Sequence, residues 1–253
     1  EQKVEAIVVA GDSGELSDGI QQVLQPLAAS GLPVFVIPGN REDRAQYRAA
    51  MDALNAKSPN VVDLSQVRLV KFDDVSFVSL PGYYDKRFIH VGDAGCQYFK
   101  EDVDALKPIL DAAAQPVVLV SHAEPYGSGP DSIDFFGDGN AGDSNLTALL
   151  KEGKVPFGVF SNIQEAGGRA NAADAKPVAE GTPSDRLYVN PGLADSTPWK
   201  LNDGGWSYGM AATVTIQGGK ASYKSLRLAQ LTEAEREQAR KLEAAVPAPG
   251  AGK

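Results

Sequence analysis

Four apolar segments of the chain end in residues whose side chains could bind a metal ion or a phosphate group. Carboxylate, amide and imidazole groups are common ligands of divalent cations, and the planar guanidinium of arginine can pair with two phosphate oxygens. The chemistry that these residue types favour is therefore metal binding, phosphate binding, or both together. The four sequences are Gly11-Asp12, Gly39-Asn40-Arg41-Glu42, Ser121-His122 and Ser161-Asn162-Ile163-Gln164.

The elements that must position these residues alternate between strand and helix in the first half of the chain. Val4–Ala10 and Val34–Ile37 are nearly continuous apolar runs, which predicts strands buried on both faces. Residue patterns predict helices over Asp18–Ser30 and Asp43–Asn55. This order of strand and helix predicts parallel strands joined by right-handed crossovers.

The rest of the chain adds strands, two more helices and two long loops. Further strands are predicted at Val67–Phe72, Val75–Leu80, Val117–Val120, Pro156–Phe160, Arg186–Val189, Gly209–Gln217 and Lys220–Leu228, and helices at Tyr98–Ala113 and Asp143–Lys151. Glycine- and polar-rich segments over 123–142 and 167–185 predict loops, which at this length are usually functional or disordered. We predict one α/β domain over residues 1–230, with two facing mixed sheets and outer helices.

The end of the chain has a different pattern. A capping box from Thr232 to Glu235 predicts a helix over residues 231–245. Residues 246–253 are rich in proline, alanine and glycine, which predicts a disordered tail.

Composition disfavours nucleic acid as a partner and limits the other structural features that the chain can have. The 253 residues carry a net charge of −9, which disfavours nucleic acid because its binding depends on neutralising phosphates with lysine and arginine. No apolar run approaches the roughly 20 residues that span a bilayer. Cys96 is the only cysteine, so no internal disulfide is possible. The chain does not begin with methionine, which indicates that it is processed or cropped. From processing we expect an exported bacterial protein of the periplasm or cell surface.

The order and spacing of the strand-end residues resemble the calcineurin-like metallophosphoesterases, whose consecutive motifs read GD, GNH(E/D), (S)H and GHxH. Three further segments support the resemblance. Ser121–Gly127 is similar to the family's SHxPPYG loop, Asn162–Gly168 to its GHxHxxGG segment, and Val189–Gly192 to its NPGS turn. The resemblance covers roughly residues 4–228 and implies a sandwich of two mixed β-sheets flanked by helices.

The resemblance also implies roles for the strand-end residues. In the family, two divalent ions about 4 Å apart activate a hydroxide that attacks phosphorus. Asp12 matches the carboxylate that bridges the ions, and Asn40 and His122 match ligands of one ion. Asn162 stands where a histidine would complete the shell of that ion. Arg41 replaces the histidine that assists the leaving group; it can hold a phosphate but cannot donate its proton at pH 7.

The ligands of the other ion depart further from the motifs. Gln164 replaces a histidine ligand, and the DxH strand that should precede Val4 is not in the sequence. The retained residues therefore suit a single divalent ion (Mn, Fe, Zn or Ca) or none. We expect Asn162 and Gln164 to hydrogen-bond across the pocket, Arg41 to pair with a carboxylate such as Asp12, and Tyr126 to line the pocket.

Three functions remain open from the sequence. The leading hypothesis is a non-catalytic member of the family that acts as a binding or structural component with a protein partner. The alternative is a divergent hydrolase of phosphomonoesters or phosphodiesters that uses one ion at Asp12, Asn40 and His122. A third is a metal-free module in which Arg41 binds a small phosphate-containing molecule. Metal content, and the residues that precede Glu1, would discriminate between the first two.

Overall fold

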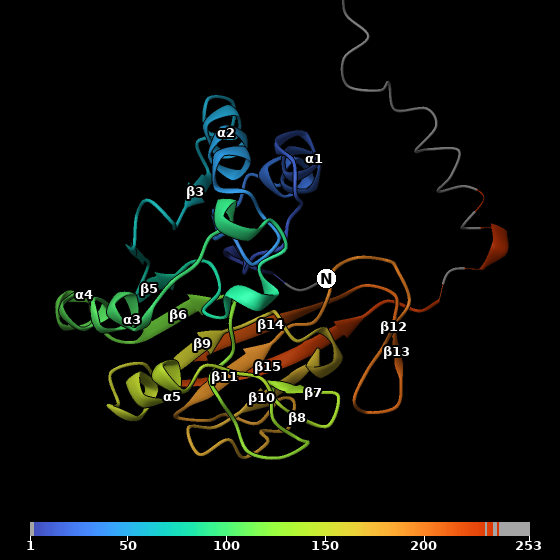
Figure 1. Ribbon diagram of the computed structural model, residues 1–253. Coiled ribbons are helices and arrows are strands. Elements are labelled where there is room, and N and C mark those ends of the chain that lie inside the picture. The colour runs from blue at the N-terminus through green and yellow to red at the C-terminus, as the bar shows by residue number, and fades with distance from the viewer. Residues whose placement is uncertain (1–2, 231, 235–236, 238–253) are drawn as a thin grey trace, which may run out of the picture.

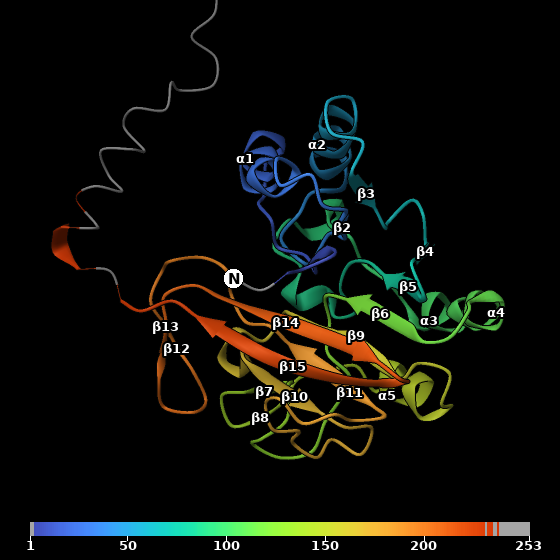
Figure 2. The same cartoon turned by 180° about the vertical axis from the view of Figure 1, so that it is seen from behind.

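The computed structural model describes residues 3–230, 232–234 and 237, and these residues form four layers in the order helix, sheet, sheet, helix (Figures 1 and 2). Most of the predicted C-terminal helix at 231–245 and all of the predicted tail at 246–253 lie outside the described residues. In the part of the chain that is described, no helix is long and apolar enough to cross a membrane.

The first sheet is built from the predicted βαβα unit. Strands β1 (Ile7–Val9), β2 (Val34–Val36) and β3 (Val61–Asp63) are parallel and lie in that order. Helices α1 (Ser17–Ala28) and α2 (Arg44–Asn55) cover its outer face, where they share an apolar cluster with alternate residues of β1 and β2. The other face of these strands is also buried, which accounts for their unbroken apolar sequence.

The second sheet has six strands in the order β10-β11-β9-β6-β5-β4, with antiparallel pairs at its two ends. Helices within residues 100–151 cover its outer face. The strands are β4 (Leu69–Phe72), β5 (Val75–Leu80), β6 (Val117–Ser121), β9 (Phe157–Val159), β10 (Arg169–Asn171) and β11 (Leu187–Asn190), and the helices are α3 (Lys100–Asp104), α4 (Leu106–Ala112) and α5 (Ser144–Lys151).

A predicted hairpin completes the inner layer. Strands β14 (Met210–Gln217) and β15 (Lys220–Arg227) pair in register across Gly218-Gly219. Ala221 and Tyr223 of β15 join the apolar cluster that also holds inward-facing residues of both sheets. This cluster is the central core, and it holds the first sheet and the hairpin against the second sheet.

Two predictions differ from the structure in detail. The segment predicted as one helix over Tyr98–Ala113 is divided into α3 and α4, because Pro108 has no N–H to donate to the carbonyl of Asp104. The loops predicted over 123–142 and 167–185 contain short strands. These are the pair β7 (Phe135–Phe136) and β8 (Gly139–Asn140), and the edge strand β10; a further short pair, β12 (Trp199–Lys200) and β13 (Trp206–Ser207), lies later in the chain.

Candidate functional site

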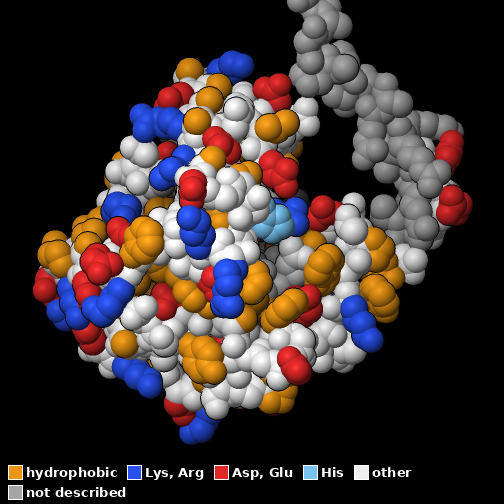
Figure 3. All heavy atoms as spheres, in the orientation of Figure 1, with side chains coloured by type: hydrophobic (Ala, Val, Ile, Leu, Met, Phe, Trp, Pro, Cys, Tyr) orange, Lys and Arg blue, Asp and Glu red, His pale blue; other side chains and the backbone are white. Residues whose placement is uncertain are grey.

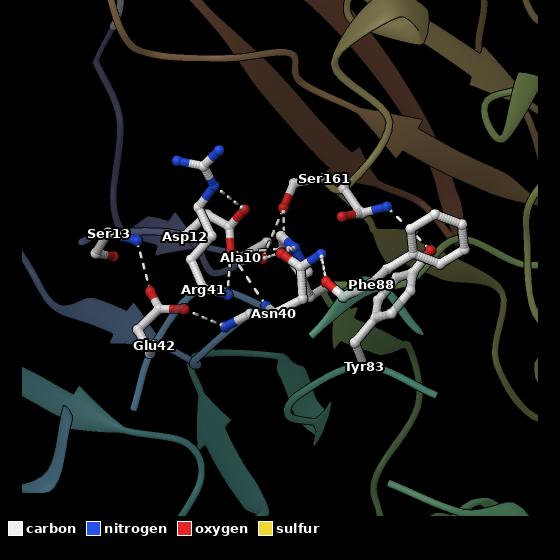
Figure 4. Close-up of polar contacts among 12 residues, drawn as sticks. Ala10, Asp12, Ser13, Asn40, Arg41, Glu42, Tyr83, Phe88 and Ser161 are labelled. Carbon is white, nitrogen blue, oxygen red and sulfur yellow. Dashed lines mark hydrogen bonds and ion pairs between the residues drawn. The ribbon is translucent and has the colours of Figure 1, made fainter. Parts of the chain in front are cut away.

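The predicted strand-end residues converge where the two sheets meet. Asp12 follows β1 and Asn40 follows β2 in the first sheet, whereas His122 follows β6 and Ser161 follows β9 in the second. The His122 ring crosses from the second sheet to the first and is fully buried. Figure 4 shows the side chains of Asp12, Asn40 and Ser161 grouped around this point.

The orientation of the His122 ring follows from its Nδ1 contacts. Nδ1 lies 2.8 Å from the carbonyl oxygen of Ala10 and 3.2 Å from Oγ of Ser161. A carbonyl oxygen can only accept a hydrogen bond, so Nδ1 carries a hydrogen and donates it to Ala10. Ser161 donates to the same carbonyl at 2.6 Å. The opposite nitrogen, Nε2, is consequently the one that faces the candidate site.

Three atoms with lone pairs meet at Nε2. It lies 3.3 Å from Oδ1 of Asp12 and 3.3 Å from Oδ1 of Asn40. The Asn40 amide is oriented by its Nδ2, which donates to the carbonyl of Phe88 at 2.9 Å, so its oxygen must point toward the ring. Without a positive charge between them these atoms would repel one another. A proton on Nε2 or a bound cation satisfies all three.

Electrostatic interactions favour the charged forms of His122 and Asp12. Burial alone would lower the pKa of His122, but the charge and hydrogen bond of Asp12 and the Ala10 carbonyl raise it to about 9. Burial would likewise raise the pKa of Asp12, but His122 and Arg41 outweigh it and lower the pKa below its usual value. An imidazolium beside a carboxylate is the stable arrangement when no metal is bound.

Close packing at the site depends on two glycines of the motifs. A Cβ on Gly39 would lie 2.4 Å from Oδ1 of Asp12, and one on Gly11 would lie 2.6 Å from Nδ1 of His122. Gly11 also has a φ of +105°, which residues with a side chain rarely adopt. Glycine at these strand ends therefore lets the imidazole and the carboxylate approach.

Arg41 takes part in the site from its outer side. Its Nε lies 3.8 Å from Oδ2 of Asp12, so the predicted pairing with that carboxylate is confirmed. Its backbone N–H also donates to Oδ1 of Asp12 at 3.2 Å. The side chain is 46% exposed, so its guanidinium remains accessible to a ligand.

The three remaining predicted residues lie around this group. Asn162 donates from Nδ2 to the hydroxyl of Tyr83 at 3.0 Å, which is the predicted bond across the pocket. Gln164 makes no such bond: its Oε1 is buried and has no partner among the residues that the structure describes. Tyr126 is half exposed, and its role in lining a pocket stays a prediction.

Glu42 belongs to the motif after β2, but the sequence analysis assigned it no role in the site. It is fully buried, with Oε1 accepting from the N–H of Ser13 at 2.6 Å and Oε2 from that of Gly39 at 2.8 Å. Burial, followed by the charge of Asp12, raises its pKa to about 7. Its carboxyl group joins the loops after β1 and β2. Its place at the fourth position of the GNH(E/D) motif was the available signal.

Glu124 was also missed. It is fully buried; Oε1 accepts from the N–H of Ile163 at 2.8 Å and from Nδ2 of Asn190 at 3.1 Å, while Oε2 has no partner in the described chain. Burial raises its pKa to about 8. It ties the segment after β6 to the segment after β9. No sequence signal marked it, because a glutamate is expected at the surface.

Three donor atoms of the strand-end residues lie close together. Within the described ranges, no group of three or more histidine, cysteine, aspartate and glutamate residues is placed to hold a metal ion. Oδ1 of Asp12 and Oδ1 of Asn40 nevertheless each lie 3.3 Å from Nε2 of His122. Adjacent ligands bonded at about 2.1 Å in a tetrahedral shell lie about 3.4 Å apart, close to the spacings around Nε2.

Comparison with known proteins decides the family. The model of the calcineurin-like phosphoesterase family matches residues 1–160. The chain belongs to this family. The predicted fold is thereby confirmed, and members of this calcineurin-like family typically bind divalent metals.

Individual relatives are distant. The chain is 23% identical over 150 residues to the uncharacterized protein MJ1162 of Methanocaldococcus jannaschii, a match that covers 58% of this chain and 63%, less than two thirds, of that protein. Among solved structures, TT1561 of Thermus thermophilus is 14% identical with a TM-score of 0.57, over 88% of this chain and 87% of that one. A putative 5'-nucleotidase from Staphylococcus aureus is 13% identical with a TM-score of 0.46, over 88% and 44%.

Exposed aromatic side chains lie on the surface near the segment that carries Gln164. Phe136 of β7 is 51% exposed and Trp206 of β13 is 50% exposed. Strands β7 and β12 both pack against the short helix η3 (Gln164–Ala166), which follows the strand-end residues of β9. Figure 3 shows hydrophobic side chains, in orange, on the face that carries β12 and β13. These aromatic residues are available to a partner.

Proposed function

We propose that this calcineurin-like chain is a non-catalytic member of the family that acts as a binding or structural component. Support comes from one observation above all: the His122 ring is fully buried and both of its nitrogens contact oxygen atoms of the chain itself. A substrate has no open nitrogen to reach. The cluster instead links the ends of β1 and β2 to the ends of β6 and β9, and so joins the two sheets.

The replaced residues support the same proposal. Arginine at position 41 cannot supply the proton that a leaving group needs. Asn162 turns its amide nitrogen to Tyr83, and Gln164 offers at most an amide oxygen, a poor ligand for zinc or iron. Among the described residues, no group of three or more histidine, cysteine, aspartate and glutamate residues is placed to hold a metal ion.

A hydrolysis assay tests the proposal. p-Nitrophenyl phosphate and bis(p-nitrophenyl) phosphate are offered with Mn²⁺, Zn²⁺, Mg²⁺ and Ca²⁺. We expect the wild type to match His122→Ala in every condition, because the imidazole is structural. His90→Ala is the matched control, since His90 is the chain's other histidine and is exposed. Manganese-dependent turnover that His122→Ala abolishes and His90→Ala retains would overturn the proposal.

The proposed partner is a protein that contacts the aromatic surface near η3. Cross-linking in extracts of the source cells, with and without the double variant Trp199→Ala/Trp206→Ala, tests this. A specific adduct should disappear in the double variant and persist in Phe99→Ala, which removes an exposed aromatic residue of another region. An adduct that persists in the double variant would contradict the assignment of this surface.

A second candidate function has an observation of its own. The Nδ1–H of His122 is held by a backbone carbonyl and Nε2 is aimed at two oxygen atoms, which is how metal-binding histidines are commonly oriented. Asp12, Asn40 and His122 would hold one divalent ion, which when bound supplies Lewis acidity and an activated water. Arg41, half exposed beside Asp12, would then bind and orient a phosphate group.

Metal content and kinetics separate this candidate from the first. The one-ion candidate requires about one metal ion per chain after purification. The Asp12→Asn variant should lose this ion, and the control variant Asp73→Asn, which changes an exposed aspartate, should retain it. Arg41→Gln should raise KM by about 10-fold or more with a smaller effect on kcat, because a charge-assisted contact to substrate is lost. Purified chain without metal, and without uptake on titration, would exclude this candidate.

A further inference from the structure

A cavity of about 300 Å³ lies on the other side of the segment that carries Asn40 and Arg41. Pro38 and Arg44, which line it, stand immediately before and after residues 39–43. Its walls come from α2, from the connection between β3 and β4, and from the segment that follows β5. None of Asp12, Arg41 and His122 lines it, so it is separate from the candidate site.

Arg68 is the first reason to regard this cavity as a binding site. Its Nε donates to the carbonyl of Ser79 at 2.8 Å, and its two Nη groups make no hydrogen bond with any described residue. It also has no ion-pair partner within the ranges that the structure describes. Burial lowers the pKa of its guanidinium, and only the charge of Asp102 opposes this. A partly desolvated positive charge is thus held without a direct counter-charge.

Two more arginines share the cavity. Arg48 is bound through Nε to both carboxylate oxygens of Asp52, at 3.0 and 3.2 Å, and its Nη groups make no hydrogen bond with the part of the chain that is described. Arg44 donates from Nη2 to a backbone carbonyl, that of Asp93, at 2.8 Å. Asp102 is the one carboxylate among the cavity's lining residues, and it caps the N–H of Phe99. The lining therefore has excess positive charge in a chain of net charge −9.

The floor of the cavity includes apolar residues. Leu80 and Tyr98 lie beneath it with almost no exposed surface, and Pro38 and Pro81 lie beside them. Ser65, Gln66 and Gln97 add polar groups to the lining. A ligand that fills this space would place an organic group on the floor and an anionic group among the guanidinium groups at the rim. Pockets that combine an apolar wall with a few convergent polar groups are typical small-molecule sites.

We propose that this cavity binds a small organic oxyanion, a phosphate monoester or a carboxylate, through Arg44, Arg48 and Arg68. A guanidinium group can donate two parallel hydrogen bonds to a carboxylate or to two oxygens of a phosphate. The two ligand types therefore share the feature that the arginines would recognise, a pair of negatively charged oxygen atoms. The volume suits one ring or a short chain with one such group. The proposal does not depend on whether the separate site at Asp12 is catalytic.

Isothermal titration calorimetry of the full chain at fixed low salt tests this proposal with four probes. Phenyl phosphate and benzoate carry the two oxyanions on the same ring, inorganic phosphate lacks the ring, and benzyl alcohol lacks the charge. We expect 1:1 binding of phenyl phosphate, benzoate or both, weaker binding of inorganic phosphate and no binding of benzyl alcohol. The comparison of the first two probes identifies which oxyanion the cavity prefers.

Variants locate the bound anion. Arg68→Gln and Arg48→Gln should each weaken binding by about 10-fold or more, because each removes a charge-assisted hydrogen-bonding group. Arg48 is largely exposed, so its variant reports binding even where Arg68→Gln destabilises the fold. Arg227→Gln removes the same charge elsewhere and should leave affinity unchanged. Absence of binding by both aromatic anions, or a loss in Arg41→Gln with none in Arg48→Gln, would overturn the proposal.

Discussion

Replacing Gly39 by alanine tests whether the strand-end cluster is as tightly packed as the structure indicates. The added Cβ would lie 2.4 Å from Oδ1 of Asp12 and 2.8 Å from both Nδ1 and Cε1 of His122. Real Cβ atoms essentially never approach other heavy atoms within 3.0 Å. The backbone and the ring must therefore separate, although each is held by hydrogen bonds: Oδ1 of Asp12 accepts two backbone N–H groups and the ring donates to Ala10.

The expected cost follows from these contacts. Overpacking of a closely packed region typically destabilises a protein by about 1–3 kcal/mol. Weakening one buried hydrogen bond of a charged group adds about 1–3 kcal/mol. We therefore expect Gly39→Ala to lower the free energy of unfolding by about 2–6 kcal/mol.

Urea denaturation followed by circular dichroism measures this change. The midpoint should fall while the m-value stays constant, because the substitution does not change how much surface becomes exposed on unfolding. Gly19→Ala is the matched control: Gly19 lies in α1, and a Cβ there meets no atom within 4 Å. The Gly19→Ala variant should have a free energy of unfolding about 0.4–1 kcal/mol higher than that of the wild type. A Gly39→Ala protein within about 0.5 kcal/mol of the wild type would refute the close packing.

Further predictions concern the helix caps and the cysteine. Asp43→Ala removes the cap of α2 and should cost about 1 kcal/mol in urea denaturation. Asp143→Ala, at the cap of α5, should cost about 1–3 kcal/mol more than Asp43→Ala, because it also leaves the buried hydroxyl of Tyr98 without its acceptor; equal costs would contradict this. Burial, then the charge of Glu42, raises the pKa of Cys96 to about 12. At pH 8 its thiolate fraction is then far below that of an unfolded thiol, so native protein should react with iodoacetamide at least about 100-fold more slowly than urea-unfolded protein. The native rate should still rise from pH 8 to 10, and a plateau in that range would show a lower pKa.

Local patterns predicted most of the elements. The apolar runs that became β2 and β6 are buried on both faces, and this is why their sequences lack the alternation of a surface strand; the run that became β1 is partly buried on both faces. The strand β3 was not predicted, since Val61–Asp63 is only three residues long and ends in an aspartate. The burial of that carboxylate depends on Tyr47, which donates to it at 3.1 Å from a helix distant in sequence.

For the site, the sequence by itself determined the residue types and the strand ends that carry them. The order of Asp12, Asn40 and His122 along the chain, each after an apolar run, was enough to predict the family's fold and a shared location. The losses at positions 41, 162 and 164 were equally visible. Spacing along the chain could carry this information because parallel strands end at the same edge of a sheet.

Only the tertiary structure decided which of these groups touch and what each one faces. The Ala10 carbonyl selects the His122 nitrogen that meets Asp12 and Asn40, and burial places Glu42 and Glu124 inside the protein although both are acidic. The excess positive charge around Arg68 likewise arises from segments far apart in sequence. Burial and contact between distant segments set the charge state and the partner of each group, and no local pattern encodes either.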